Sequence, residues 1–358
     1  MGHTAFDRRQ FNQLLALSLA GATLPFGSLL AQGRKRNIAI GHTGITWPAR
    51  PPGARRGGPP PATAGADAPT PSVPPVPVPA GPSAADLPAA AGARRGGGPP
   101  PPDAALNEAI FKDVSELGFS GLELFDWQIT GLESQGVLGG FVDRYKLPLI
   151  SSYTSINLTD PARRAETIAA AVVVANILKK YGGKTIVIGP SGRVGGPSYN
   201  FNDHKQNIVT TLNELGKAIT DVGLIAALHQ HTGTAVETRD ETYATMEAVD
   251  TRYVKFGPDV GQLQKGGVDP VEVVRTFLPV VQHMHLKDWV GGPAMAGYCA
   301  LGLGKVDLVG ILDLMEGRTL GGMIMVELDS GGQMPYTPRE SGRIAHDWLV
   351  KNGVAMKA

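Results

Sequence analysis

The chain has 358 residues, and its 33 lysine and arginine residues nearly balance its 32 aspartate and glutamate residues. The sequence has no basic patch of the kind that indicates a nucleic-acid-binding protein. The one cysteine, Cys299, excludes a disulfide framework within the chain and a zinc site built from cysteines.

The first 31 residues are typical of an export signal. Asp7-Arg8-Arg9-Gln10-Phe11 is a twin-arginine pattern, and a weakly apolar run follows over residues 14–31. Pro25 and Gly27 interrupt this run, which is too weakly apolar to predict a membrane span. Twin-arginine signals are addresses read by the Tat export machinery. We therefore expect a signal peptide and a periplasmic or otherwise exported protein. An N-terminal helix that stays attached is the alternative.

A first strand is predicted at residues 36–42, with His42 at its end and Trp47 shortly after. The composition then changes, because residues 48–102 hold 18 of the 29 prolines and no aromatic residue. Such low-complexity sequence cannot bury enough apolar surface to fold. We expect a disordered insertion that lies within a domain, since only one strand precedes it.

After residue 103 the pattern alternates between helices and strands. Apolar side chains at helical spacing, such as Ile110 and Val114, predict the first helix, and Gly118 ends it. The predicted helices cover residues 104–117, 138–145, 161–181, 202–222, 241–249, 269–277, 307–315 and 338–351. The predicted strands after the first cover residues 121–125, 147–153, 184–189, 224–229, 253–256, 280–285 and 322–328.

Strict alternation of eight strands with eight helices predicts a parallel sheet. We expect one α/β domain, a (β/α)8 TIM barrel over residues 34–354 that carries the insertion after its first strand. A doubly wound open sheet is the alternative. It is disfavoured because Gly41-His42-Thr43-Gly44 lacks the G-x-G-x-x-G spacing of a dinucleotide-binding turn.

The seventh predicted strand carries an unusual pattern, with His283, His285 and Lys287 at alternate positions. Alternate residues of a strand share one face. Strands of a parallel barrel are normally apolar on both faces, so three polar groups on one face must meet a metal, a ligand or each other. A pair of core histidines with satisfied hydrogen bonds is the alternative.

Other predicted strands also end in polar residues, and the chemistry of a (β/α)8 barrel lies at these carboxyl ends. These rim residues are His42, Glu123, Tyr153, His229, His231, Asp259, His283, His285, Lys287 and Glu327. Imidazole and carboxylate groups from separate strands can converge on a divalent cation. The best such set is His229, Asp259, His285 and Glu327. Capping of a helix or turn by Asp259 and a salt bridge of Glu327 are the alternatives.

Several of these stretches resemble the sugar phosphate isomerase/epimerase superfamily, the xylose isomerase-like barrels. The resemblance covers roughly residues 36–354 without the insertion. It rests on G-L-E-L-F at Gly121, A-L-H-Q-H-T-G-T at Ala227, P-D-V-G-Q-L at Pro258, H-M-H-L-K-D at His283, L-G-L-G-K-V-D at Leu301 and M-V-E-L-D at Met325.

The resemblance implies one divalent metal, Mn2+ above all, with Co2+, Mg2+ and Zn2+ as alternatives. Family members hold it with a glutamate, an aspartate, a histidine and a second glutamate, and Asp259, His285 and Glu327 match the last three. The first position falls on His229, a form that resembles the inosose dehydratase branch. Two further positions depart from the family pattern, where Gln262 replaces a histidine and Leu303 replaces a glutamate.

A metal in this place would act as a Lewis acid on a carbonyl, and a base would remove the proton next to it. Glu327, His229 and His231 are the candidate bases, and Lys287 and Glu123 would stabilise or orient substrate oxygens. The resulting enediolate either takes up a proton elsewhere or expels a β-leaving group. We expect the substrate-binding residues to be His42, Trp47, Tyr153 and His283.

The near-neutral net charge of the expected exported protein suggests a sugar or cyclitol as substrate rather than a heavily phosphorylated molecule. We expect a metal-dependent lyase or dehydratase that acts on a keto-sugar or keto-cyclitol, ahead of a sugar isomerase or epimerase. A non-catalytic sugar-binding barrel is the remaining alternative. A small carbohydrate and the Tat machinery are the expected partners, and the sequence leaves monomer and homo-oligomer open.

Overall fold

The computed structural model describes residues 35–48, 101–329 and 334–357. The expected export signal at residues 1–31 and nearly all of the expected insertion, residues 49–100, lie outside the described residues. Among the helices of the described residues, none has the length and apolar character needed to span a membrane.

Eight parallel strands form one sheet in the order β6-β5-β4-β3-β2-β1-β10-β7. Two bridges, Phe256 with Val281 and Asp259 with His285, join the two edge strands and close the barrel. The strands of the barrel are β1 (Ile40–Thr43), β2 (Leu122–Phe125), β3 (Leu149–Ile156), β4 (Thr185–Pro190), β5 (Ile225–Leu228), β6 (Val254–Phe256), β7 (Met284–Leu286) and β10 (Ile324–Val326). The predicted (β/α)8 barrel is therefore confirmed.

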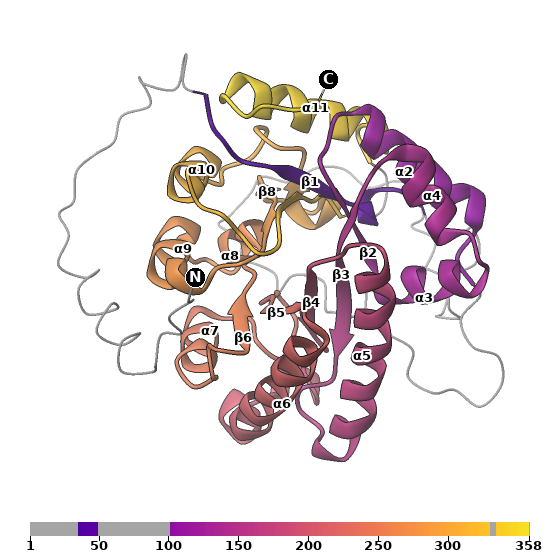
Figure 1. The fold of residues 1–358 in the computed structure, drawn as a ribbon. Coiled ribbons are helices and arrows are strands. Elements are labelled where there is room, and N and C mark those ends of the chain that lie inside the picture. Colours follow the sequence, from indigo (N-terminus) through magenta and orange to yellow (C-terminus); the bar gives the residue numbers. More distant parts are fainter. Residues whose placement is uncertain (1–34, 49–100, 330–333, 358) are drawn as a thin grey trace, which may run out of the picture.

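Helices surround the strands on the outside of the barrel (Figure 1). The α-helices are α2 (Ala104–Glu116), α3 (Asp126–Ser134), α4 (Leu138–Tyr145), α5 (Arg164–Lys180), α6 (Phe201–Val222), α7 (Arg239–Met246), α8 (Val260–Lys265), α9 (Pro270–Phe277), α10 (Leu308–Met315) and α11 (Pro338–Lys351). Short 3-10 helices are η1 (Gly44–Thr46), η3 (Pro161–Arg163), η4 (Gly196–Ser198), η5 (Leu278–Val280) and η6 (Ala294–Gly297).

Helix α6 shows how the sequence determines these elements. The side chain of Asn200 accepts a hydrogen bond from the backbone of Asn202 at its start, and Gly223 ends it in the left-handed region at φ 93°. Its buried residues, such as Ile208, Leu212 and others at spacings of three and four, face the core. Strand β4, by contrast, is buried at every position, as expected for a parallel strand covered on both sides.

The structure corrects the sequence-based outline around β7. Residues 280–283 are not strand, because η5 ends at Val280 and β7 begins only at Met284. A two-stranded antiparallel hairpin, β8 (Asp288–Trp289) with β9 (Tyr298–Cys299), follows directly. Helices α3 and α8 were also not predicted. Strict alternation therefore holds for the barrel strands, whereas the rim carries extra elements that shape the site.

Candidate functional site

The site is a group of buried polar side chains at the carboxyl ends of the barrel strands. In β2, Leu122 and Leu124 belong to the hydrophobic core and Glu123 points the other way, into the barrel. Residues at the ends of β5, β7 and β10 and at the β6–α8 junction also lie in this group. His229, Asp259 and His285 are 0% exposed, and Glu123 and Glu327 are at most 5% exposed.

His285 lies at the centre of this group, between two carboxylates. Its Nε2 is 2.8 Å from Glu123 Oε1. Its Nδ1 forms an ion pair with Glu327 Oε2. Burial alone would lower the pKa of His285, but the two carboxylates outweigh it and raise the pKa well above its usual value. The ring is thus held from both sides, which fixes its orientation.

Glu123 binds three side chains with its two oxygens. Ser151 donates a hydrogen bond of 2.6 Å to Oε2, and His283 Nε2 lies 3.1 Å from the same oxygen. Burial would raise the pKa of Glu123, but His285 and His283 hold it below its usual value. The carboxylate therefore orients the two histidines, and the fully buried His283 lies beside it.

His229 and Asp259 present two buried ligand atoms to each other. His229 Nδ1 lies 3.2 Å from the carbonyl of Gly257, which can only accept, so Nδ1 carries the proton and Nε2 carries the lone pair. Nε2 is 3.9 Å from Asp259 Oδ2. Among the described residues neither atom has a hydrogen-bond partner. Burial, followed by the charge of His285, lowers the pKa of His229, so its ring is neutral and suited to bind a cation.

These groups could hold a divalent metal. One ligand atom each from His229, Asp259 and His285 lies within 4.8 Å of the others, and Glu123, His283 and His285 form a second such group. We favour the first, because Glu123 already accepts a hydrogen bond from Ser151. Glu327, the fourth expected ligand, is adjacent through its contact with His285 Nδ1. A nitrogen and oxygen donor set of this kind suits Mn2+, Zn2+ and similar ions.

Lys287 is fully buried beside the same carboxylates. Its Nζ donates a hydrogen bond of 2.6 Å to Glu327 Oε1 and forms ion pairs of 3.2 Å with Asp259 Oδ2 and 2.8 Å with Asp329 Oδ2. Asp329 was not among the predicted site residues, although it ends the M-V-E-L-D stretch that contains Glu327. The structure thus adds a carboxylate to the site.

His231 is close to His229, with ring centroids 6.0 Å apart, but its nitrogens are occupied. Its Nδ1 lies 2.7 Å from the carbonyl of Thr232, and its Nε2 lies 2.7 Å from the amide nitrogen of Gln262. Thr232 in turn donates its hydroxyl to Gln262 Oε1, which assigns the amide as donor to His231. In this arrangement the lone pair of His231 already accepts a hydrogen bond.

Two tyrosines border the group. The ring of Tyr153 meets His229 edge-on, with centroids 5.4 Å apart. Tyr298 comes from the hairpin, and its ring lies 4.5 Å from Lys287 Nζ and 4.8 Å from Lys265 Nζ. Its hydroxyl is buried. Sequence patterns gave no signal for Tyr298, because a two-residue strand is too short to show a period.

The structure does not bring His42 and Trp47 into this group. His42 packs edge-on against Trp47 and Phe119, with ring centroids 5.0 Å and 4.9 Å away. The indole nitrogen of Trp47 donates to Asp113 of α2. Thr43, the next residue along β1, pairs in register with Glu123, so His42 faces the helix layer. Substrate binding by His42 and Trp47 remains a prediction without support from this arrangement.

A rim loop beside the hairpin is held by one buried carboxylate, Asp288. It accepts backbone hydrogen bonds from Trp289 at 2.8 Å, Gly302 at 2.9 Å, Gly304 at 2.9 Å and Val306 at 3.2 Å. A side chain at Gly304 would place its Cβ 2.1 Å from Asp288 Oδ1, so glycine is required there. Asp288 therefore fixes the path of the loop through backbone contacts.

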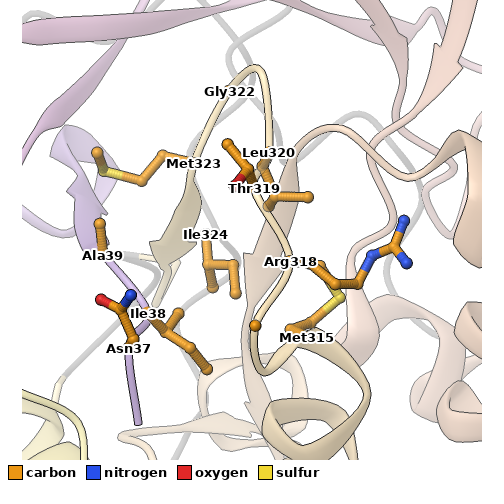
Figure 2. Close-up of a pocket in the computed structure, with 11 residues that line it drawn as sticks. Asn37, Ile38, Ala39, Met315, Arg318, Thr319, Leu320, Gly322, Met323 and Ile324 are labelled. Carbon is orange, nitrogen blue, oxygen red and sulfur yellow. The ribbon is translucent and has the colours of Figure 1, made fainter.

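The opposite, amino-terminal end of the barrel has a cavity of about 260 Å3. It is lined by residues that precede β1 and β10, among them Ile38, Leu320 and Met323, with Asn37 and Arg318 at its polar edge (Figure 2). No group of possible metal ligands occurs there among the described residues.

Comparison with known proteins shows the family and the fold. A family model described as the xylose isomerase-like TIM barrel matches residues 111–351. An inosose dehydratase of Clostridium botulinum is 25% identical over 247 residues, which cover 62% of this chain and 82% of that protein.

Two solved structures share the fold. One is a probable 3-DHS dehydratase of Bacillus anthracis, with a TM-score of 0.57, 17% identity and coverage of 68% of this chain and 92% of that chain. The other is a xylose isomerase-like TIM barrel protein of Mycobacterium smegmatis in complex with magnesium, with a TM-score of 0.54 and 19% identity. It covers 70% of this chain and 90% of its own.

Proposed function

Because the chain belongs to the xylose isomerase-like TIM barrel family, we propose that it is a metal-dependent lyase that acts on a keto-sugar or keto-cyclitol. The observation that carries the proposal is the buried pair of His229 Nε2 and Asp259 Oδ2, which face each other without hydrogen-bond partners among the described residues, next to His285 and Glu327. The names of the relatives support the reaction class, since one is an inosose dehydratase and another a probable dehydratase.

The metal would be held by His229, Asp259, His285 and Glu327. When bound, a divalent cation supplies Lewis acidity to a substrate carbonyl and so acidifies the adjacent C–H bond. We expect Mn2+, and the magnesium complex of the Mycobacterium smegmatis relative supports a divalent ion in this fold. Glu123 would orient His285 through Nε2, as a carboxylate behind a histidine ligand commonly does.

Glu327 is the preferred base among the three candidates. Burial opposes its ionisation, but His285 and Lys287 outweigh burial and lower its pKa, so it is a carboxylate at neutral pH. It can therefore take the proton next to the carbonyl, after which the β-leaving group departs with its electron pair. His231 is disfavoured because its lone pair accepts from Gln262, and His229 because its lone pair faces Asp259.

The same geometry favours elimination over epimerisation. An epimerase that uses two carboxylate bases needs one on each face of the substrate. Here the first family position is His229, and Glu123 is engaged with Ser151 and two histidines. Glu327 is then the candidate carboxylate base, and a single base suits a reaction that ends with loss of a leaving group.

The test is turnover by the purified protein loaded with Mn2+. Inososes, 3-keto-glycosides and free ketoses are incubated in D2O and followed by NMR, with the Glu327→Gln variant as the matched control. We expect an eliminated product from the wild type and a loss of about 100-fold or more in the variant. Solvent deuterium in recovered substrate without eliminated product would assign the protein as an isomerase or epimerase. Full turnover after rigorous metal removal would refute metal dependence.

We also propose that the protein is exported through the Tat pathway. Arg8 and Arg9, followed by the weakly apolar run, support this proposal. Changing both arginines to lysine should leave a longer, uncleaved form in the cytoplasm, as measured by cell fractionation and mass spectrometry. Unchanged export of that variant would contradict the assignment.

A further inference from the structure

Lys287 is a cation placed among the residues that would bind the metal. Its side chain is 0% exposed, and its Nζ contacts Glu327 Oε1 at 2.6 Å and Asp259 Oδ2 at 3.2 Å. Both carboxylates belong to the proposed ligand set. A lysine that is buried to this extent requires compensating charge, and here two metal ligands supply part of it.

The third partner of Lys287 is different in kind. Asp329 Oδ2 lies 2.8 Å from Nζ, but Asp329 is not one of the four proposed metal ligands. Its side chain is 19% exposed, so it lies at the outer side of the buried group. Lys287 thus has one carboxylate partner that it can keep when a metal occupies the other two.

The stem of Lys287 is confined. A Cβ on Gly261 would lie 2.7 Å from Lys287 Cγ, so the stem passes directly over α8. The ring of Tyr298 covers the ammonium group at 4.5 Å. With the stem held in this way, the ammonium group can shift among its three carboxylates but stays close to them. A divalent ion bound by Asp259 and Glu327 would strongly repel it at such short range in a site that excludes water.

We propose that Lys287 is an exchangeable cation, which neutralises Asp259 and Glu327 in the metal-free protein and shifts toward Asp329 when a divalent ion binds. The inference rests on the proposed metal site. It assigns Lys287 a positioning role that the sequence did not indicate. The lysine keeps the ligand carboxylates charged and in place, and the metal must compete with it for them.

The test compares Mn2+ binding by the wild type and by the Lys287→Met variant, with isothermal titration calorimetry and thermal unfolding. Removal of the competing charge should tighten the Kd for Mn2+ by about tenfold or more. The metal-free variant should unfold at a lower temperature than the metal-free wild type, because its buried carboxylates lack compensation. Its gain in Tm on addition of Mn2+ should be larger, as tighter binding to the native state requires.

Lys265→Met is the matched control. Lys265 lies on the ring of the same tyrosine, at 4.8 Å, but it has no ion pair with Asp259 or Glu327 in the described part of the chain. We expect its loss to change the Kd for Mn2+ by less than about threefold. If both variants bound Mn2+ more tightly to the same extent, the effect would come from the loss of any positive charge near the site, and the proposal would be overturned.

The double variant Lys287→Met/Asp329→Asn covers the case in which the single variant does not fold, because it removes one carboxylate together with the lysine. It should also bind Mn2+ more tightly than the wild type. Weaker or unchanged binding by a folded Lys287 variant would overturn the exchange and show that the lysine organises the ligands. If neither wild type nor variants bind Mn2+, the metal site itself fails. Binding of Mn2+ by the variants but not by the wild type would support the exchange, since Lys287 would then outcompete the metal completely.

Discussion

At the amino-terminal end of the barrel, a cavity of about 260 Å3 opens between the residues that precede β1 and β10, and both apolar and polar side chains line it (Figure 2). At the carboxyl end, histidines, carboxylates and a lysine are buried against each other. The difference teaches that a cavity and a group of buried charges are separate features of this barrel. Buried charges need partners, and the end that collects them is the end where a cation can be bound.

Loss of the His285 imidazole should have the largest effect on function, and it concerns only the carboxyl end of the barrel. His285→Ala removes a proposed metal ligand and the partner of both Glu123 and Glu327. We expect loss of bound metal and a decrease in kcat/KM of at least about 1,000-fold. Metal analysis of the purified variant and steady-state kinetics provide the measurements. Retention of metal at wild-type stoichiometry would remove His285 from the ligand set.

A smaller effect is expected from the residue behind that ligand. Glu123→Gln keeps the shape but removes the charge that faces His285 Nε2 at 2.8 Å. Loss of such a partner typically lowers metal affinity by about 10- to 100-fold. Calorimetric titration with Mn2+ measures this change, and Ser151→Ala serves as a milder control because it removes only one donor to the same carboxylate. Unchanged affinity would show that Glu123 does not act through His285.

His42 tests a histidine that lies outside the carboxyl-end group. Burial, opposed by the contact with Thr43, lowers its pKa from 6.5 to about 4. The unfolded chain therefore binds a proton between these pH values and the native chain does not, so stability falls as pH decreases from about 6.5 to about 4. Between these pH values, this one group changes the free energy of unfolding by at most about 1.4 kcal/mol per pH unit.

His42→Phe should flatten the pH dependence of unfolding in that window by up to this amount, whereas catalysis should be little affected. Urea unfolding of the metal-free protein at several pH values measures the slope. Other buried histidines, such as His231, keep part of the acid sensitivity in the variant. An unchanged slope would contradict the lowered pKa of His42.

The smallest effect is expected at the other end. Arg318 lines the amino-terminal cavity, is exposed, and donates to the carbonyl of Leu278 at 2.9 Å. Arg318→Ala should change the free energy of unfolding by less than about 0.5 kcal/mol and leave kcat/KM unaltered. A marked loss of turnover would mean that the cavity takes part in function, and the contrast between the two ends would no longer hold.

The sequence was sufficient to predict the barrel, and it selected several of the polar residues that the structure brings together. Polar residues such as Glu123, His285 and Glu327 stand out because the strands around them are buried on both faces and are otherwise apolar. Their positions at strand ends then brought them to one rim. The family resemblance placed Asp259 and His229 in the same group, and the structure brings these residues together.

What the sequence missed depends on single-residue register and on very short elements. In β1, Thr43 pairs in register with Glu123 and shares the inner face with it, so His42 turns outward. A shift of one residue reverses every side chain of a strand. Tyr298 and Asp329 lie in segments without a period, and only their tertiary contacts with Lys287 reveal them.

Asp288 has a consequence for how this enzyme could diversify. It anchors the rim loop through the backbone amides of Gly302, Gly304 and Val306, and the Leu303 side chain takes no part in these bonds. Leu303, 48% exposed at the tip between two constrained glycines, can therefore change without loosening the anchor. Substitutions at position 303, natural or engineered, can therefore change the exposed surface of the loop while the buried residues of the site stay the same.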